Sequence, residues 1–300
     1  MKKSLLYGLA LFLSFASCEK EGGGDERTGE SPYISRVYEY VPAPGQFINT
    51  TTSAYIEGFT ASDVLQKASA RLVGRVDSLV TLGSFGGYIV VGFDHTIPNV
   101  EDEYDFKVYG NAMAGSSEPG VVMVSYDTNG NGKPDDEWYE IAGSEYDNPE
   151  TIKEYEITYY RPDPLDGDVL WNDNKGGRGY VRRVNAHKQA SYFPVWIPGE
   201  TLTFKGTKLP GNAEDQGQGG NQYWVLKPFE WGYADNRPNG SEGSKFKIEW
   251  AVKKDGSPAN LKGVDFIKVY TGVLQEAGWT GETSTEIAGI EDLHFHTDRE

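Results

Sequence analysis

Short segments rich in aromatic and β-branched residues recur along this chain, and polar turn sequences separate them. The segments alternate polar with apolar residues or are briefly all apolar, which is typical of β-strands rather than helices. Asn-Gly and Asp-Gly pairs, strong hairpin signals, stand at 129–130, 131–132, 166–167, 239–240 and 255–256. We therefore predict an all-β fold, a two-sheet β-sandwich of jelly-roll type with long functional loops.

The predicted strands share this composition and are bounded by turn residues. They are 87–93, 104–109, 121–126, 138–141, 155–160, 192–196, 201–204, 223–226, 246–252 and 264–270. One short helix is also expected after Thr60, which can cap it. In that segment Val64, Leu65, Ala68 and Leu72 recur at helical spacing.

Charge and cysteine content narrow the classes of protein that fit this sequence. Asp and Glu total 45 against 28 Lys and Arg, which gives a net charge of −17. Such an acidic field disfavours nucleic acid and anionic lipid as partners. Cys18 is the only cysteine, so the fold cannot contain an internal disulfide and must rest on its hydrophobic core. We expect one β-sandwich domain over residues 32–300.

The N-terminal residues have the layout of a bacterial lipoprotein signal. A basic start, an apolar run over 5–15 and two small residues precede Cys18. Since the thiol is the group that accepts diacylglycerol, we predict a signal peptide over 1–17 and lipidation at Cys18. Residues 18–31 are polar, glycine-rich and mostly acidic, which predicts a flexible tether. The alternative is an ordinary secretory signal with an incidental cysteine.

A loop at 127–137 carries oxygen-bearing side chains at alternating positions and then a glycine, like the start of a calcium-binding loop. Alternate side chains in a tight coil converge on one point, and the glycine permits the sharp turn. The predicted calcium ligands are Asp127, Asn129, Asn131, the carbonyl of Lys133 and Asp135, with Asp136 or Glu137 completing the shell. Trp138 stands where an EF-hand has glutamate, so the loop resembles thrombospondin-type and dockerin-like loops only locally. An Asn-Gly hairpin without a metal is the alternative.

A second set of polar residues lies at predicted strand ends, where a jelly-roll often holds a structural calcium. The set is Asp105, Asn111, Glu118, Asp265 and Glu282. The favoured interpretation is that these side chains cap turns and pair with nearby Lys or Arg.

Three predicted loops place a tryptophan beside polar side chains. An aromatic ring covers the apolar face of a sugar or another flat ligand, while polar neighbours bind its hydroxyl or amide groups. The candidate ligand-binding residues are Trp171, Asp173, Asn174, Arg178, Trp231, Tyr233, Asp235, Asn236 and Trp279. The alternative for each tryptophan is a place in the core.

No catalytic residue is predicted. The chain lacks a Gly-x-Ser-x-Gly elbow, a His-Glu-x-x-His motif and a phosphate-binding loop. Paired carboxylates could hydrolyse a glycoside, but a chain with 45 acids brings some together in any fold.

Several segments resemble a family of Bacteroidetes cell-surface lipoproteins, often labelled cell surface or PKD-type proteins, although no PKD signature is present. They are 40–49, 82–88, 93–95, 105–106, 118–120, 134–140 and 281–287. The acidic residues after Cys18 also resemble the signal that exports such lipoproteins to the outer face of the outer membrane. Members are similar to proteins encoded beside TonB-dependent receptors, including those for cobalamin and glycan uptake.

These observations together predict a lipid-anchored, non-catalytic protein on the cell surface, stabilised by calcium. We expect it to capture a nutrient, cobalamin or a glycan, for a TonB-dependent outer-membrane receptor. The tether would raise the ligand concentration near that receptor. Two alternatives remain: an extracellular jelly-roll glycan hydrolase or lyase, and an adhesin or structural surface protein.

Overall fold

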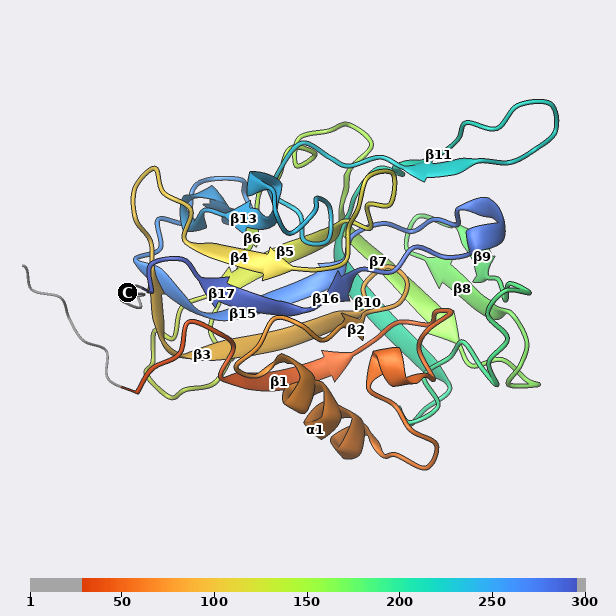
Figure 1. Ribbon diagram of the computed structural model, residues 1–300, viewed down its shortest axis with the longest axis horizontal. Coiled ribbons are helices and arrows are strands. Elements are labelled where there is room, and N and C mark those ends of the chain that lie inside the picture. The colour runs from red at the N-terminus through yellow and green to blue at the C-terminus, as the bar shows by residue number, and fades with distance from the viewer. Residues whose placement is uncertain (1–28, 296–300) are drawn as a thin grey trace, which may run out of the picture. The chain divides into compact units, whose positions relative to one another are not determined.

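The computed structural model describes residues 29–295, and strands dominate it (Figure 1). The chain divides into two units, Met1–Glu30 and Ser31–Glu300, and the helices and strands of the described residues belong to the second. The predicted signal peptide and Cys18 lie outside the described residues.

Two sheets contain most of the strands, and each pair of neighbouring strands is antiparallel. The six-stranded sheet has the order β1 (Arg36–Val41), β3 (Tyr88–Pro98), β15 (Gly263–Thr271), β5 (Gly120–Ser125), β6 (Trp138–Ile141) and β14 (Ala251–Val252). The four-stranded sheet has the order β10 (Thr201–Lys208), β7 (Ile152–Tyr160), β8 (Val169–Asp173) and β9 (Arg178–Val181).

The remaining elements are short. A three-stranded sheet has the order β13 (Lys245–Phe246), β4 (Phe106–Tyr109) and β17 (Gly289–Asp292). Two-stranded pairs join β11 (Ala213–Asp215) to β12 (Trp224–Leu226) and β16 (Glu286–Ile287) to β2 (Val80–Thr81). The helical segments are α1 (Ala61–Leu72) and the 3-10 turns η1 (Thr51–Ser53), η2 (Glu242–Ser244), η3 (Ile248–Trp250) and η4 (Gly278–Thr280).

Helix α1 begins where its cap predicts. The Thr60 hydroxyl accepts from the Asp63 amide (3.3 Å), and the Asp63 carboxylate accepts from the Thr60 amide (2.8 Å). This reciprocal capping box satisfies two amides that a helix start leaves free. The buried face of α1 consists of Val64, Ala68 and Leu72, so the expected helix is confirmed.

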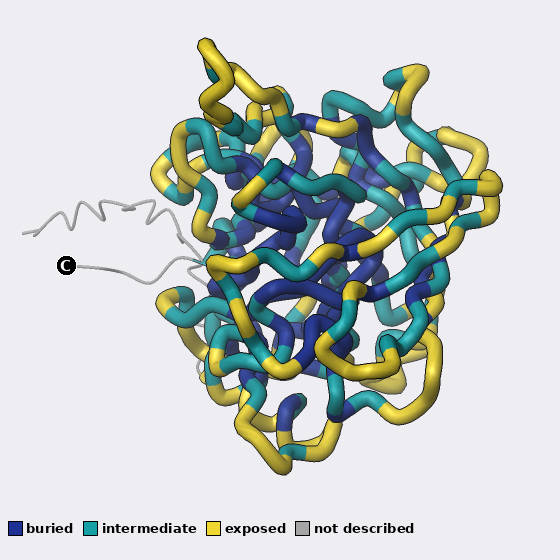
Figure 2. The backbone as a smooth tube through the Cα atoms, turned by 90° about the vertical axis from the view of Figure 1, so that its right-hand side faces the viewer, coloured by how far each residue is buried: buried dark blue, intermediate teal, exposed yellow. Residues whose placement is uncertain are grey.

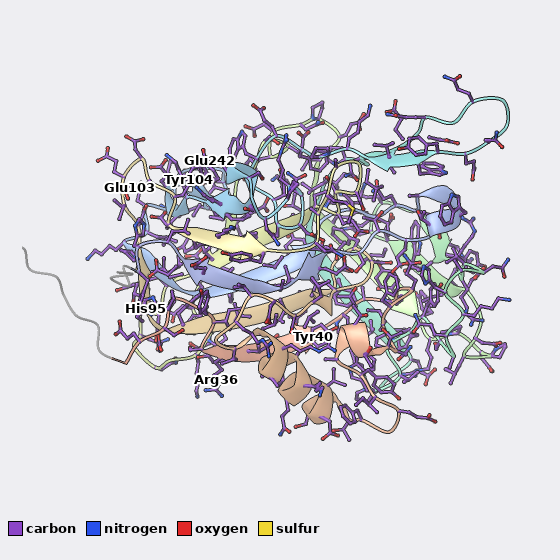
Figure 3. All side chains as sticks on the ribbon, in the orientation of Figure 1. Arg36, Tyr40, His95, Glu103, Tyr104 and Glu242 are labelled. Atoms are coloured by element: carbon purple, nitrogen blue, oxygen red, sulfur yellow. The ribbon has the colours of Figure 1, made fainter. Side chains whose placement is uncertain are left out.

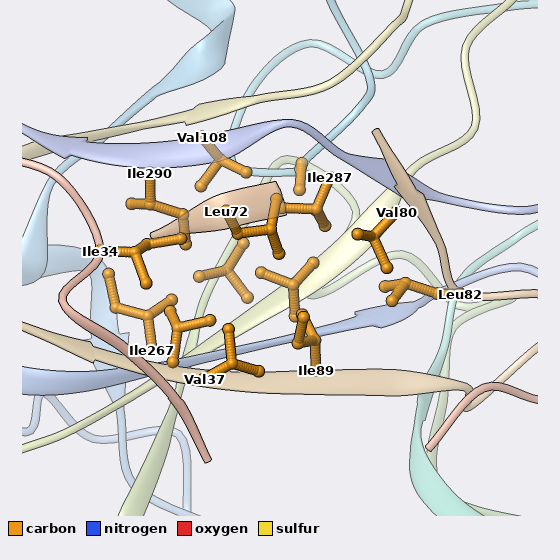
Figure 4. Close-up of a cluster of buried hydrophobic side chains, with 14 of the residues drawn as sticks. Ile34, Val37, Leu72, Val80, Leu82, Ile89, Val108, Ile267, Ile287 and Ile290 are labelled. Atoms are coloured by element: carbon orange, nitrogen blue, oxygen red, sulfur yellow. The ribbon is translucent and has the colours of Figure 1, made fainter. Parts of the chain in front are cut away.

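The six-stranded sheet lies between two hydrophobic clusters. On β5, Val122 and Val124 belong to the first cluster, whereas Val121 and Met123 contact the second, as alternation along a strand requires. The apolar face of α1 and the short strands β2, β4, β16 and β17 add to the first cluster (Figure 4). Side chains of β7 and β10 add to the second. Buried backbone accordingly runs through the interior, with exposed loops around it (Figure 2).

The all-β class is confirmed, and a sandwich arrangement is consistent with the stacked sheets. The jelly-roll type stays a prediction. Two expected strands are wrong. The 3-10 turn η3 interrupts 246–252 between β13 and β14, and no strand forms at 192–196 although Tyr192 and Phe193 are fully buried. Pro194 lacks the amide hydrogen that a strand ladder needs. The segment therefore fills the core without joining a sheet.

Candidate functional site

The loop between β5 and β6 folds its polar side chains inward. The Asn131 amide donates to Asp127 (3.1 Å) and to Asn129 (3.0 Å), and the Asn131 side chain donates to Asp135 (3.0 Å). Gly132 has φ +68°, a left-handed conformation that favours glycine. The side chains of four predicted calcium ligands therefore converge as their spacing predicts, and calcium binding itself stays a prediction.

Further contacts define how the predicted shell would close. The Lys133 carbonyl accepts from the Asp135 amide at 2.9 Å. Asp136 accepts from the Asn129 side chain at 3.0 Å, whereas Glu137 accepts from the Tyr139 hydroxyl at 2.8 Å. Asp136 rather than Glu137 is therefore placed to complete a calcium shell.

Asp265 holds the start of this loop. Its carboxylate accepts from the Asp127 amide (2.7 Å) and from the Thr96 hydroxyl (2.5 Å). Asp265 thus anchors the loop to β15 and β3, in agreement with the turn-capping interpretation of this residue.

The three tryptophans of the predicted recognition loops do not form one surface. Trp171 lies on β8 and Trp279 on η4, at the same end of the domain (Figure 1). Trp279 is 65% exposed. Trp231 instead contacts Trp250 (ring centroids 4.6 Å apart), which contacts Tyr104 at the opposite end (Figure 3).

Two polar candidates near Trp171 shape the β8–β9 hairpin. Asp173 accepts from the Tyr155 hydroxyl (2.7 Å) and from the Gly177 amide (2.6 Å). Asn174 donates to the Glu154 carbonyl at 2.8 Å. These side chains position the hairpin, while Arg178 on β9 is exposed and free to meet a ligand.

Two candidates from the Trp231 loop are core residues. Tyr233 is 1% exposed, and its hydroxyl accepts from the Glu145 amide at 3.0 Å. Asn236 is fully buried and exchanges two hydrogen bonds with the backbone of Phe229. Neither side chain reaches the surface, so their predicted role as ligand contacts is wrong: the polar atoms serve the fold.

A cavity of ≈ 230 Å³ lies beside Trp171. The β8–β9 hairpin and the residues after it contribute Trp171, Gly179, Tyr180, Val181 and Arg182, and other segments contribute Ser84, Leu274, Gln275, Glu276 and Glu282. Arg182 and Glu276 form an ion pair at its rim (2.8 Å). The cavity thus combines aromatic surface with both signs of charge.

Glu282 lines this cavity, and one of its carboxyl oxygens has no hydrogen-bond partner among residues 29–295. The side chain is only 4% exposed, and its Oε1 accepts from the Gln46 amide at 2.7 Å. Its Oε2 is buried without a hydrogen-bond partner among residues 29–295. Burial raises the pKa of Glu282 well above the ordinary range. Leaving a buried polar atom unpaired costs about 1–3 kcal/mol.

Three carboxylates from distant parts of the chain meet elsewhere. Glu118, Asp235 and Glu286 each bring an oxygen within 4.8 Å of the other two. Asp235 accepts from the Asn111 amide (2.8 Å) and from the Glu286 amide (2.9 Å). Glu286 also accepts from the Thr81 hydroxyl at 2.9 Å.

These carboxylates repel one another, and either a proton or a cation would relieve the repulsion. Burial raises the pKa of all three, and the Glu286 charge adds to the increase for Glu118 and Asp235. The side-chain amide of Asn111 suits both the protonated cluster and a cluster that holds a cation. Its nitrogen can donate to Asp235 (3.1 Å) and Glu286 (3.2 Å), and the reversed amide offers its oxygen to a cation.

The carboxylate cluster was only partly foreseen. Asp235 was predicted as a ligand contact, and Asn111 and Glu118 were assigned to strand ends. Glu286 was missed, because no local motif connects positions so far apart in the sequence. Asp105 is buried elsewhere, where it accepts from the Ile248 amide (2.6 Å) and contacts His294 Nε2 (2.8 Å).

His95 makes two carboxylate contacts, with Asp292 (2.9 Å) and Asp94 (2.8 Å). Burial opposes its charged form, but the hydrogen bonds to Asp292 and Asp94 raise its pKa. Figure 3 places it at the end of the domain opposite β8. It is therefore remote from the Trp171 cavity and gives no support to catalysis there.

Comparisons of the chain with protein-family models and with curated proteins found no match. Among residues 29–295, no helix combines the length and the apolar character needed to cross a bilayer.

Proposed function

We propose that this protein is a lipid-anchored, ligand-binding protein of the cell surface that captures a glycan for a TonB-dependent outer-membrane receptor. The observation that carries the proposal is a cavity lined by both the aromatic residue Trp171 and the acidic residue Glu282. A sugar fits both, because it has an apolar ring face and hydroxyl groups that donate hydrogen bonds.

The size of the cavity favours a glycan over cobalamin. Its ≈ 230 Å³ lies below the roughly 300–1,000 Å³ of pockets that enclose drug-sized molecules. One sugar ring suits that space, and the exposed Trp279 nearby would contact a further ring. Cobalamin would have to bind across the rim, where fewer contacts exclude water.

Calcium has a structural role in this proposal. The loop that would hold it joins β5 and β6, whose terminal residues Ser125 and Trp138 are paired. An ion bound by the oxygens of Asp127, Asn129, Asn131 and Asp135 would replace the hydrogen bonds that now link them, and it would stabilise the end of this hairpin.

Isothermal titration calorimetry with a panel of glycans and with cobalamin, in calcium and in chelator, tests the function. We expect a glycan to bind and Trp171→Ala to weaken it about tenfold through loss of the aromatic face. Tyr223→Ala is the matched control, since Tyr223 is 65% exposed on another hairpin. Tight cobalamin binding without any glycan binding, or equal affinity in Trp171→Ala, would refute the proposal.

The alternative of a glycan hydrolase has less support. Such enzymes use two carboxyl groups flanking a bound sugar. The two carboxyl groups that line the Trp171 cavity, those of Glu276 and Glu282, already contact Arg182 (2.8 Å) and the Gln46 amide (2.7 Å).

A further inference from the structure

A second cavity, of ≈ 310 Å³, lies between the two main sheets. The six-stranded sheet and the chain after β14 contribute Met123, Trp138, Glu140, Val252, Lys253, Lys254 and Tyr270, the four-stranded sheet contributes Lys153, Glu154, Lys205, Gly206 and Thr207, and Tyr146 lies on the connection between them. This lysine groove shares no residue with the Trp171 cavity.

The charge of the groove is opposite to that of the chain. Four lysines line it against two glutamates, whereas the chain as a whole carries −17. A cationic site in an acidic protein concentrates anions locally although the surrounding field repels them. The groove would therefore attract a negative group at short range, although Asp147 and Asp255 interact with Tyr146 and offset part of the positive charge.

Both glutamates of the groove already have partners. Glu140 contacts the Lys153 ammonium at 3.2 Å and also accepts from the Thr207 hydroxyl. Glu154 contacts the Lys205 ammonium at 2.5 Å. Lys253 and Lys254 are exposed, and neither ammonium has a carboxylate within 4.0 Å in the part of the chain that the structure describes. Lys254 interacts with Glu154 and Lys253 with Asp255 only at longer range, so both ammonium groups are available to a ligand.

Aromatic rings also line the groove. The Lys153 ammonium lies 3.1 Å from the centroid of the Tyr146 ring, and burial lowers the pKa of Lys153. An anion in the groove would favour the charged form of Lys153. Trp138 adds a second, partly exposed ring. A ligand that fits has a flat or apolar face as well as a negative group.

We propose that the lysine groove binds an acidic sugar, with its anionic group at Lys253 and Lys254 and its ring face against Trp138. The volume suits one or two sugar rings. The groove constitutes a binding site separate from the Trp171 cavity, and it can be occupied whether or not that cavity binds a glycan.

Nuclear magnetic resonance titrations at low salt with glucuronate, glucose and inorganic sulfate test this proposal. Glucuronate and glucose have the same ring and differ in charge, so we expect glucuronate to bind about tenfold tighter. Added salt should weaken glucuronate binding by screening. Sulfate binding equal to that of glucuronate would refute recognition of a sugar, and equal affinity for glucose and glucuronate would refute recognition of charge.

Two variants assign the binding to the groove. Lys253→Gln/Lys254→Gln should weaken glucuronate binding about tenfold and leave any glycan bound beside Trp171 unaffected. Lys67→Gln, an exposed lysine on α1, removes charge elsewhere and should bind as the parent does. Trp138→Ala should weaken binding through the ring contact. Parental affinity in both groove variants would overturn the proposal, whatever happens at Trp171.

Discussion

The carboxylate cluster makes a strong prediction about stability and pH. Burial raises the folded-state pKa of Glu118, Asp235 and Glu286. The folded protein therefore holds protons that the unfolded chain releases. The stabilisation is complete below the unfolded pKa values, near 4, and is lost as pH rises through the raised folded values.

The size of the effect follows from proton linkage. For each proton that only the folded state holds, the unfolding free energy falls by about 1.4 kcal/mol per unit of rising pH. For a domain of this size that corresponds to a fall of about 3–5 °C in Tm per pH unit. Against a typical total of roughly 5–15 kcal/mol, such a slope is readily measured.

Glu118→Gln tests the assignment. The Glu118 side chain retains partial exposure and its neighbours Asp235 and Glu286 are buried, so an amide can replace the protonated acid with little repacking. The amide still donates a hydrogen bond but has no proton to release. We expect the unfolding free energy of the variant to fall less steeply with pH, by the contribution of one proton. Above neutral pH the variant should therefore be more stable than the parent.

The assay is thermal unfolding from pH 5 to 9, with chelator present so that no cation replaces the proton. Glu101→Gln removes an exposed carboxylate and serves as the matched control, with the parental slope expected. If Glu118→Gln shows the parental slope as well, the pH dependence does not come from this carboxylate cluster. A variant less stable than the parent at every pH would show that the acid itself is needed.

Three further predictions address separate parts of the chain. Asp127→Ala should lower Tm in calcium but not in chelator, and an equal loss in both would remove the calcium prediction. Thr60→Ala should cost about 1 kcal/mol in urea unfolding by removing the α1 cap, whereas Ser62→Ala, exposed inside the helix, should cost much less; equal losses would contradict the capping argument. Cys18→Ala should release the protein from the membrane fraction, and continued sedimentation with outer membranes would refute lipid anchoring.

Local chemistry explains which features were predictable. Helix α1 begins and ends near its signals because the Thr60 cap and the apolar spacing lie within one segment. The side chains of the loop at 127–136 converge because their spacing is itself the motif. The expected strand at 138–141 coincides with β6. Interactions close in sequence leave a pattern that one chain reveals.

Long-range features left no such pattern. Glu118, Asp235 and Glu286 meet only after β5 and β16 have found their places, so their proximity depends on topology. Strands β8 and β9 were missed, since alternation in Val169–Asp173 and Arg178–Val181 is weak and their burial is partial. Tyr233 looked like a surface aromatic because its neighbours are polar, but Asp235 and Asn236 are buried beside it.

The predicted calcium loop at 127–137 directly precedes Trp138, a residue of the lysine groove, and this predicts a coupling. Trp138, which lines the groove, directly follows the loop and pairs with Ser125 at its other end. Calcium that fixes the loop would also fix the Trp138 ring and so reduce the cost of ordering it on binding. Glucuronate should then bind tighter in calcium than in chelator, and calcium should bind tighter by the same factor when glucuronate is present, because linkage is reciprocal.

Asp127→Ala should abolish the difference, whereas Lys67→Gln should retain it. Equal glucuronate affinity in calcium and chelator, in a protein shown to bind calcium, would mean that the loop does not position Trp138.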